Sequence, residues 1–111
     1  MSADDDQSFE LLRIRAEQCG SEAVIVLEGE FDMTGTQRFW AFVDATLAAE
    51  PRAVIVDAGG LEFVDSSGLL ALMRARDAAV EADAAFTIRN PSAALRRIVE
   101  LAGLEELLAP E

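Results

Sequence analysis

A chain of 111 residues has room for one small domain. Its 51% hydrophobic and 27% charged residues are typical of a folded protein rather than a disordered one. Twenty-one acidic residues against nine basic ones give a net charge of −12, which disfavours binding to nucleic acid or to an anionic membrane surface. No apolar run approaches the ~18–20 residues that cross a bilayer. The acidic start lacks the basic and apolar regions of a secretory signal, so we expect a cytoplasmic protein.

The missing residue types narrow the chemistry further. All nine basic residues are arginines, and the chain has neither histidine nor lysine. It therefore lacks an imidazole base or metal ligand, a Schiff-base amine and the lysine of a phosphate-binding loop. Its single cysteine cannot form an internal disulfide. We expect a binding or switching module without a cofactor or a bound metal, and not an enzyme.

The first half of the chain predicts a hairpin followed by a helix. We expect residues 1–8 to form a disordered acidic leader in front of a single domain at 9–109. Alternating apolar side chains over 9–17 predict a half-buried strand, and the β-branched run at 23–29 predicts a buried strand paired with it. Residues 34–50 then carry apolar side chains at helical spacing.

The second half alternates strands and helices. Apolar strands are expected at 53–57 and 85–89, a loop at 59–64, a helix at 66–82, a helix that starts at Pro91 and ends at Gly103, and a helical turn at 105–108. Each of the last two long helices should turn an apolar row inward: Leu69, Leu72, Met73, Ala79 and Val80 in one, and Ala94, Leu95, Ile98, Leu101 and Ala102 in the other. The order β-β-α-β-α-β-α predicts an α/β domain with a small mixed four-stranded sheet and helices packed mainly on one face.

The densest candidate site is the segment VDSSGL at 64–69, at the start of an expected helix. Asp65 or Ser66 can cap the free N–H groups of the first helical turn, and such a cap alone is a sufficient structural explanation of the motif. The functional interpretation is a hydroxyl exposed at a helix start beside a glycine, where a partner protein has room to approach. Phosphorylation there would add about −1.5 to −2 charges where the helix dipole tolerates an anion.

Four segments in order resemble the STAS domain family, and within it the anti-sigma-factor antagonists. LEFVDSSGL at 61–69 is similar to the family signature, and LEGEFD at 27–32 is similar to the strand end L-x-G-E-x-D. AVIVD at 53–57 resembles the strand before the signature, and NPS at 90–92 with RRIVELAGL at 96–104 resembles the C-terminal helix. The resemblance extends over nearly the whole chain and implies a single STAS-type domain.

The resemblance implies a bacterial protein that acts by partner switching. An unphosphorylated antagonist of this family binds and sequesters an anti-sigma factor, which is itself a serine kinase with an ATP-binding fold. Phosphorylation releases that partner, and a PP2C-type phosphatase removes the phosphate. The first serine after the aspartate accepts the phosphate in this family, and it corresponds to Ser66 here. The residues expected on the partner-binding face are Asp32, Asp65, Ser67, Gly68, Leu69 and Leu70.

Two departures from the family pattern concern the partner. Leu70 is large where a small residue is common, and Asp57-Ala58-Gly59-Gly60 stands where a D-L-S-like segment is frequent. Other members keep the fold but act without phosphorylation, as scaffold subunits of lipid-transport or stress-signalling complexes. Such a scaffold role is the alternative function for this chain.

Several interpretations of single residues stay open. Asp57 ends a buried strand as the phosphoacceptor of a receiver domain does, but the chain has no lysine to accompany it. Asp32, Asp57 and Asp65 could gather around a Mg²⁺ ion, although carboxylates at strand ends more often cap loops. Cys19 lies in an expected turn without a basic neighbour to activate its thiol. Phe42 is the aromatic candidate for an exposed partner contact.

Overall fold

The structure is a computed structural model that describes residues 10–108. Its elements in chain order are β1 (Leu12–Cys19), β2 (Glu22–Phe31), η1 (Met33–Gly35), α2 (Thr36–Ala48), β3 (Ala53–Val64), α3 (Ser66–Glu81), β4 (Ala85–Arg89), α4 (Ala93–Ala102) and η2 (Glu105–Leu108). The predicted order of strands and helices is confirmed, and bounds other than those of β3 differ from the predicted ones by a few residues. The leader predicted at 1–8 lies outside the described residues. Within 10–108, no helix is long and apolar enough to cross a membrane.

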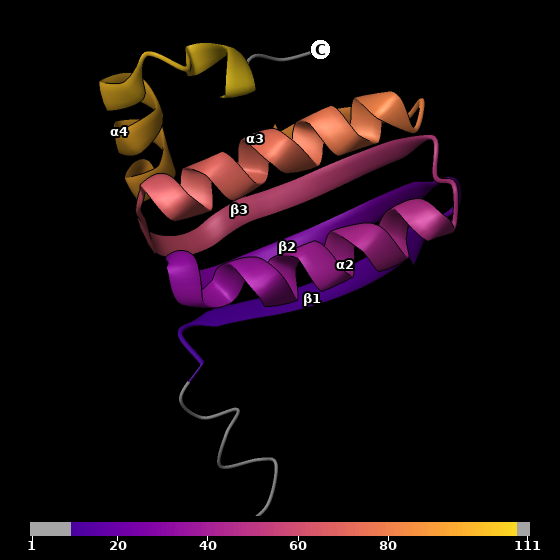
Figure 1. The fold of residues 1–111 in the computed structure, drawn as a ribbon, viewed down its shortest axis with the longest axis horizontal. Helices are drawn as coiled ribbons and strands as arrows, with labels where there is room; N and C mark the ends of the chain where they lie inside the picture. The colour runs from indigo at the N-terminus through magenta and orange to yellow at the C-terminus, as the bar shows by residue number, and fades with distance from the viewer. Residues whose placement is uncertain (1–9, 109–111) are drawn as a thin grey trace, which may run out of the picture.

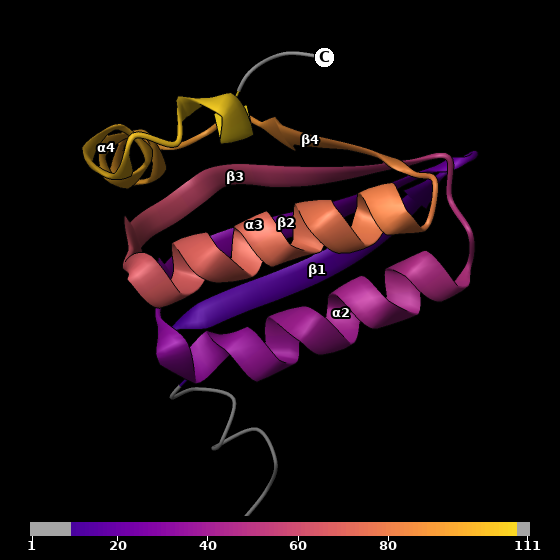
Figure 2. The same cartoon turned by 45° about the horizontal axis from the view of Figure 1, so that its top comes forward.

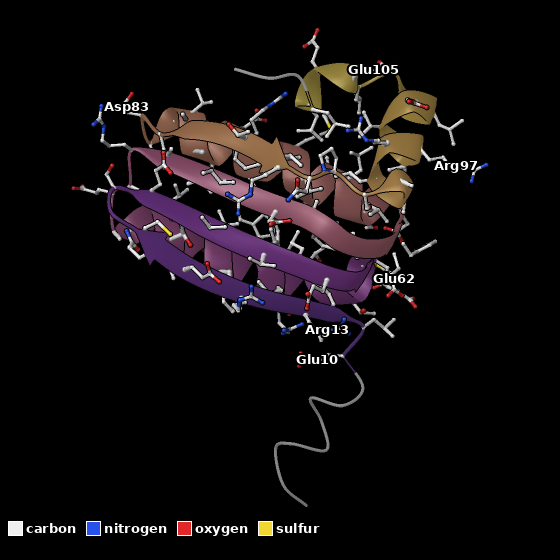
Figure 3. The ribbon with its side chains drawn as sticks, turned by 180° about the vertical axis from the view of Figure 1, so that it is seen from behind. Glu10, Arg13, Glu62, Asp83, Arg97 and Glu105 are labelled. Atoms are coloured by element: carbon white, nitrogen blue, oxygen red, sulfur yellow. The ribbon has the colours of Figure 1, made fainter. Side chains whose placement is uncertain are left out.

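The four strands form one mixed sheet in the order β1-β2-β3-β4. β1 pairs antiparallel with β2, whereas β2 and β3 pair in parallel, as do β3 and β4. α2 and α3 lie side by side on one face of the sheet, and α4 lies near the N-terminal end of α3 (Figures 1 and 2). Seen from behind, the opposite face of the sheet is not crossed by any helix of the described range (Figure 3). The predicted α/β architecture, with helices mainly on one face, is therefore confirmed.

The hydrophobic core lies between the sheet and the pair of helices α2 and α3. Phe31 of β2 and Phe39 of α2 are fully buried, and their ring centroids lie 5.1 Å apart in an edge-to-face arrangement. α3 can approach the sheet closely because most of its buried residues are small: Gly68, Ala71, Ala75 and Ala79 accompany Leu69 and Leu72. The same close approach fixes the start of α3 against the end of β2.

β3 is longer than the sequence pattern predicts. β3 includes residues 59–64, where the sequence pattern predicts a loop. β2 is also longer than predicted and ends at Phe31. The register between the two strands shifts twice, so the pairing bends instead of stopping. At Gly60 a Cβ would lie 2.7 Å from Cγ of Glu28, and the glycine therefore keeps the bent strands in contact. As a result β3 leads directly to Asp65.

Three positions predicted to face inward are exposed instead, namely Val80, Leu101 and Ala102. The side chain of Val80 in α3 is 62% exposed and that of Leu101 in α4 is 81% exposed. The packed face of α3 is formed mainly by small residues, and that of α4 by Leu95 and Val99. Phe42, the aromatic candidate for exposure, is half-buried.

Candidate functional site

Two helices begin at one edge of the sheet. β2 ends at Phe31 and leads through Asp32 into η1 and α2, while β3 ends at Val64 and leads through Asp65 into α3. Because β2 and β3 are adjacent and parallel, their carboxyl ends meet at this edge, which is where α/β proteins commonly bind their ligands. Figures 1 and 2 show both helix starts at the same end of the molecule. The fold therefore brings the predicted site residues Asp32, Asp65 and Ser66 to a common edge.

Asp65 holds the start of α3 in place. Its Oδ1 accepts a hydrogen bond from the backbone N–H of Gly68 at 3.0 Å, which makes it the N-cap of the helix. Its own N–H donates to the carbonyl of Phe31 at 3.2 Å and so ties the helix start to the end of β2. The sequence left the capping role open between Asp65 and Ser66, and the structure gives it to Asp65.

Ser66 is the first residue of α3 and is exposed. Its hydroxyl lies at the start of a helix of 16 residues, where backbone N–H groups are free and the helix dipole is positive. Ser67 is half-buried and lines a groove between α2 and α3. Of the two serines, Ser66 is the more accessible to an approaching protein.

Gly68 and Leu69 lie in the interior, although the resemblance places them on the partner-binding face. A Cβ on Gly68 would lie 2.5 Å from the carbonyl oxygen of Phe31 and 3.0 Å from Cγ of its ring. Leu69 is 5% exposed and belongs to the hydrophobic core. Both residues support the exposed ones by holding α3 against β2, and their own side chains do not form the surface.

Asp32 occupies the corresponding place in front of η1. Its Oδ1 accepts hydrogen bonds from both the backbone N–H and the hydroxyl of Thr34, with the N–H at 2.9 Å. These two bonds stabilise the ionised carboxylate and hold the pKa of Asp32 below its ordinary value. Asp32 and Asp65 thus both place negative charge at the edge of the sheet where η1 and α3 begin.

The same edge carries large apolar side chains in contact with solvent. Met33 in η1 is 71% exposed and Leu70 in α3 is 45% exposed, and both line the groove between the two helices. Phe63, near the end of β3, is 47% exposed. The prediction includes Leu70 but misses Met33 and Phe63. The place of Met33 directly after a capping aspartate is the sequence signal that could have indicated its exposure.

The three aspartates proposed as a Mg²⁺ site do not gather. Asp57 lies within β3, roughly 23 Å of strand before Val64 at ~3.3 Å per residue. Its Oδ2 is 3.4 Å from Nη2 of Arg89, and its Oδ1 accepts a hydrogen bond from the N–H of Gly59 at 3.1 Å. Across 10–108, no group of three or more histidine, cysteine and acidic residues is arranged to hold a metal ion.

Comparison with known sequences identifies the family. Residues 14–109 match a family model described as "Mlab, STAS domain". A STAS-domain containing protein of Pseudomonas aeruginosa (strain UCBPP-PA14) is 32% identical over 88 residues, which cover 79% of this chain and 86% of that protein.

Solved structures share the fold. An anti-sigma factor antagonist from Mycobacterium paratuberculosis superimposes with a TM-score of 0.77 at 25% identity, covering 87% of this chain and 82% of that one. The anti-sigma factor antagonist SpoIIAA in its unphosphorylated form gives 0.75 at 21% identity, covering 87% and 86%. A sulfate transporter family protein from Wolinella succinogenes gives 0.70 at 16% identity, covering 83% and 79%. Together with the match over 14–109, these findings show that the chain belongs to the STAS domain family.

Proposed function

We propose that this protein is an anti-sigma-factor antagonist that acts by partner switching, with Ser66 as its phosphoacceptor. One observation carries the proposal: Asp65 caps α3, so the exposed hydroxyl of Ser66 is not needed to start the helix. Asp32, Asp65 and the exposed side chains of Met33 and Leu70 lie at the same edge, where β2 leads into η1 and β3 into α3. Structural similarity to antagonists of anti-sigma factors supports the same class of function.

The switch follows from the charge at this edge. A kinase would transfer the γ-phosphoryl group of ATP to Oγ of Ser66, which releases ADP and the hydroxyl proton. The added charge of about −1.5 to −2 falls on a helix start, where the fold tolerates an anion. It also lies at the edge that carries Asp32 and Asp65, so the surface becomes more negative and bulkier than the one that binds the partner. Hydrolysis of the phosphate ester restores the hydroxyl and the binding surface.

The partners follow from this cycle. The bound protein is an anti-sigma factor with an ATP-binding serine kinase fold, which the unphosphorylated antagonist sequesters. A PP2C-type phosphatase reverses the modification. The antagonist itself carries no catalytic residue and needs no cofactor, and the cycle runs in the cytoplasm without contact to nucleic acid or membrane.

A second candidate function is a STAS scaffold subunit that is not phosphorylated, in a lipid-transport or stress-signalling complex. The match to a model described as "Mlab, STAS domain" and the structural similarity to a sulfate transporter family protein favour it. Under this hypothesis the same edge binds one partner permanently. Ser66→Ala and Ser66→Asp variants would then capture the same proteins.

The test compares five versions of the full chain as bait in lysate of the source bacterium, with captured proteins identified by mass spectrometry. Wild type, Ser66→Ala and Ser66→Asn should capture an ATP-binding anti-sigma factor, whereas Ser66→Asp should lose it because only that variant adds charge. Ser21→Asp, in the exposed turn between β1 and β2, is the matched control for added charge and should behave as wild type. Capture of one transport or scaffold complex by every version would refute partner switching and support the scaffold role.

A further inference from the structure

The structure has a groove between α2 and α3. Its volume is about 260 Å³, and its lining includes Met33 of η1 and Ser67 in the first turn of α3. Met33 and Leu70 flank it, Trp40 and Ala71 line it deeper, and Arg74 stands one turn beyond Leu70. Exposed apolar side chains around a hollow are typical of the anchor points of protein interfaces.

The groove is continuous with the proposed switch. Ser67 lines the groove and follows Ser66 directly, so a protein that covers Ser66 also lies over the part of the groove that Ser67 lines. Met33 in turn follows Asp32, whose carboxylate caps η1. The proposed contact surface and the groove are therefore one surface with an acidic part and an apolar part.

The charged residues near the two ends of the groove have opposite signs. Asp32 precedes the lining residue Met33, and Asp65 lies two residues before the lining residue Ser67. Arg74, at the other end of the lining, lies eight residues along α3 from Ser66, which corresponds to about 12 Å of helix. An occupant that complements both ends carries a cation toward the aspartates and a carboxylate toward Arg74. A second copy of this chain fits poorly, because each copy has a net charge of −12.

We propose that the groove receives one large apolar side chain of the anti-sigma factor, with a carboxylate of that factor bound by Arg74. Met33 and Leu70 contact the inserted side chain and so decide which anti-sigma factor is bound. This inference rests on the proposed function and adds the specificity of the same surface. It separates two tasks: Ser66 sets whether the partner binds, and the groove sets which partner binds.

The test measures the affinities of at least two purified ATP-binding anti-sigma factors of the source bacterium for the full-length chain, by calorimetry. Met33→Ala and Leu70→Ala should each weaken binding of the preferred factor by roughly tenfold. The ratio of its affinity to that of the second factor should fall as well. Val80→Ala is the matched control, because Val80 is an exposed apolar residue of the same helix outside the groove. It should change neither affinity by more than about twofold.

The possible outcomes separate this inference from the proposed function. Unchanged affinities in Met33→Ala and Leu70→Ala, with binding still lost in Ser66→Asp, would overturn the groove and leave the switch intact. Equal losses for every factor would overturn the specificity role. If no anti-sigma factor binds the wild-type chain, the proposed function fails and this inference fails with it. Denaturation midpoints equal to wild type confirm that the exposed substitutions leave the fold unchanged.

Discussion

The starts of η1 and α3 share the same capping arrangement but leave different groups free. In each, an aspartate follows a parallel strand and its Oδ1 accepts a backbone N–H, from Thr34 in one case and from Gly68 in the other. At the first start the nearby hydroxyl, that of Thr34, also donates to the capping carboxylate. At the second start the exposed hydroxyl of Ser66 is not part of the cap.

This difference is the reason why only the start of α3 suits the proposed switch. A phosphate on Thr34 would break the hydrogen bond that the hydroxyl donates to Asp32 and would put two anions in contact. A phosphate on Ser66 adds charge to a helix start whose cap stays intact. Phosphorylation of Ser66 would therefore make the surface more negative without loss of the fold beneath it.

The largest effect is expected from the buried glycine at each start. In Gly68→Ala the new Cβ meets the backbone carbonyl oxygen of Phe31 at 2.5 Å, whereas in Gly35→Ala it meets the side-chain Cδ2 of Leu12 at 2.9 Å. The backbone carbonyl of Phe31 cannot move aside as easily as the end of the Leu12 side chain can. Gly68→Ala should therefore lower the free energy of unfolding by about 2–3 kcal/mol, and Gly35→Ala by about 1 kcal/mol or less.

Urea denaturation of both variants and of wild type measures this difference. An equal slope m in all three proteins shows that the transition remains two-state. A larger loss in Gly35→Ala than in Gly68→Ala would contradict the rigid contact between α3 and the end of β2. Ser67→Ala provides a control in the same turn of α3 and should lie within about 0.5 kcal/mol of wild type.

An intermediate effect is expected from the two caps. Asp65→Ala should cost about 1 kcal/mol, because the N–H of Gly68 is partly buried and loses its acceptor. Asp32→Ala should cost a few tenths of a kcal/mol, because the N–H of Thr34 is exposed and water can replace the carboxylate. Thermal unfolding of the two variants checks the order. Asp65→Asn keeps an acceptor oxygen and should recover most of the loss, and equal losses in all three variants would contradict the capping roles.

Most of the fold could be predicted from the sequence because its signals are local. Alternation and β-branched runs indicate the strands, and the glycine at 103 marks the end of α4, where it adopts a φ of 70°. The continuation of β3 through Gly59 and Gly60 could not be predicted, because glycine pairs usually mark a loop. Only the pairing with Glu28 on the neighbouring strand shows that these glycines belong to a bent strand.

The candidate site could be predicted in part. The motif gives Asp65 and Ser66, and the resemblance adds Asp32, but neither shows which residue caps α3. The helical spacing after the motif places Leu69 in the inward row and leaves Leu70 outside it, and exposures of 5% and 45% confirm this. The resemblance, in contrast, places both residues on the partner-binding face, because it does not show the angle at which α3 meets the sheet. The groove beside Leu70 depends on that angle as well.

The smallest effect concerns the charge of Asp32. The hydroxyl of Thr34 is the main cause that lowers the pKa of Asp32, and its N–H adds to the effect. Thr34→Val removes the hydroxyl and keeps the N–H, so the pKa of Asp32 should rise toward its ordinary value. An NMR titration of the Asp32 carboxyl carbon measures the shift. Thr36→Val is the control, because the hydroxyl of Thr36 donates to the carbonyl of Met33 and not to Asp32.

The sign of the pH dependence follows from the lowered pKa of Asp32. A carboxyl whose pKa is lower in the folded chain than in the unfolded chain stabilises the fold above its unfolded pKa, and this contribution is lost as the pH falls through the folded pKa. Thr34→Val should therefore be less stable than wild type at neutral pH, and the gap should narrow in acid as Asp32 is protonated in both. A gap that is constant with pH would show that Thr34 acts through packing alone. In that case Thr34 would distinguish the two helix starts by its packing and not through the ionisation of Asp32.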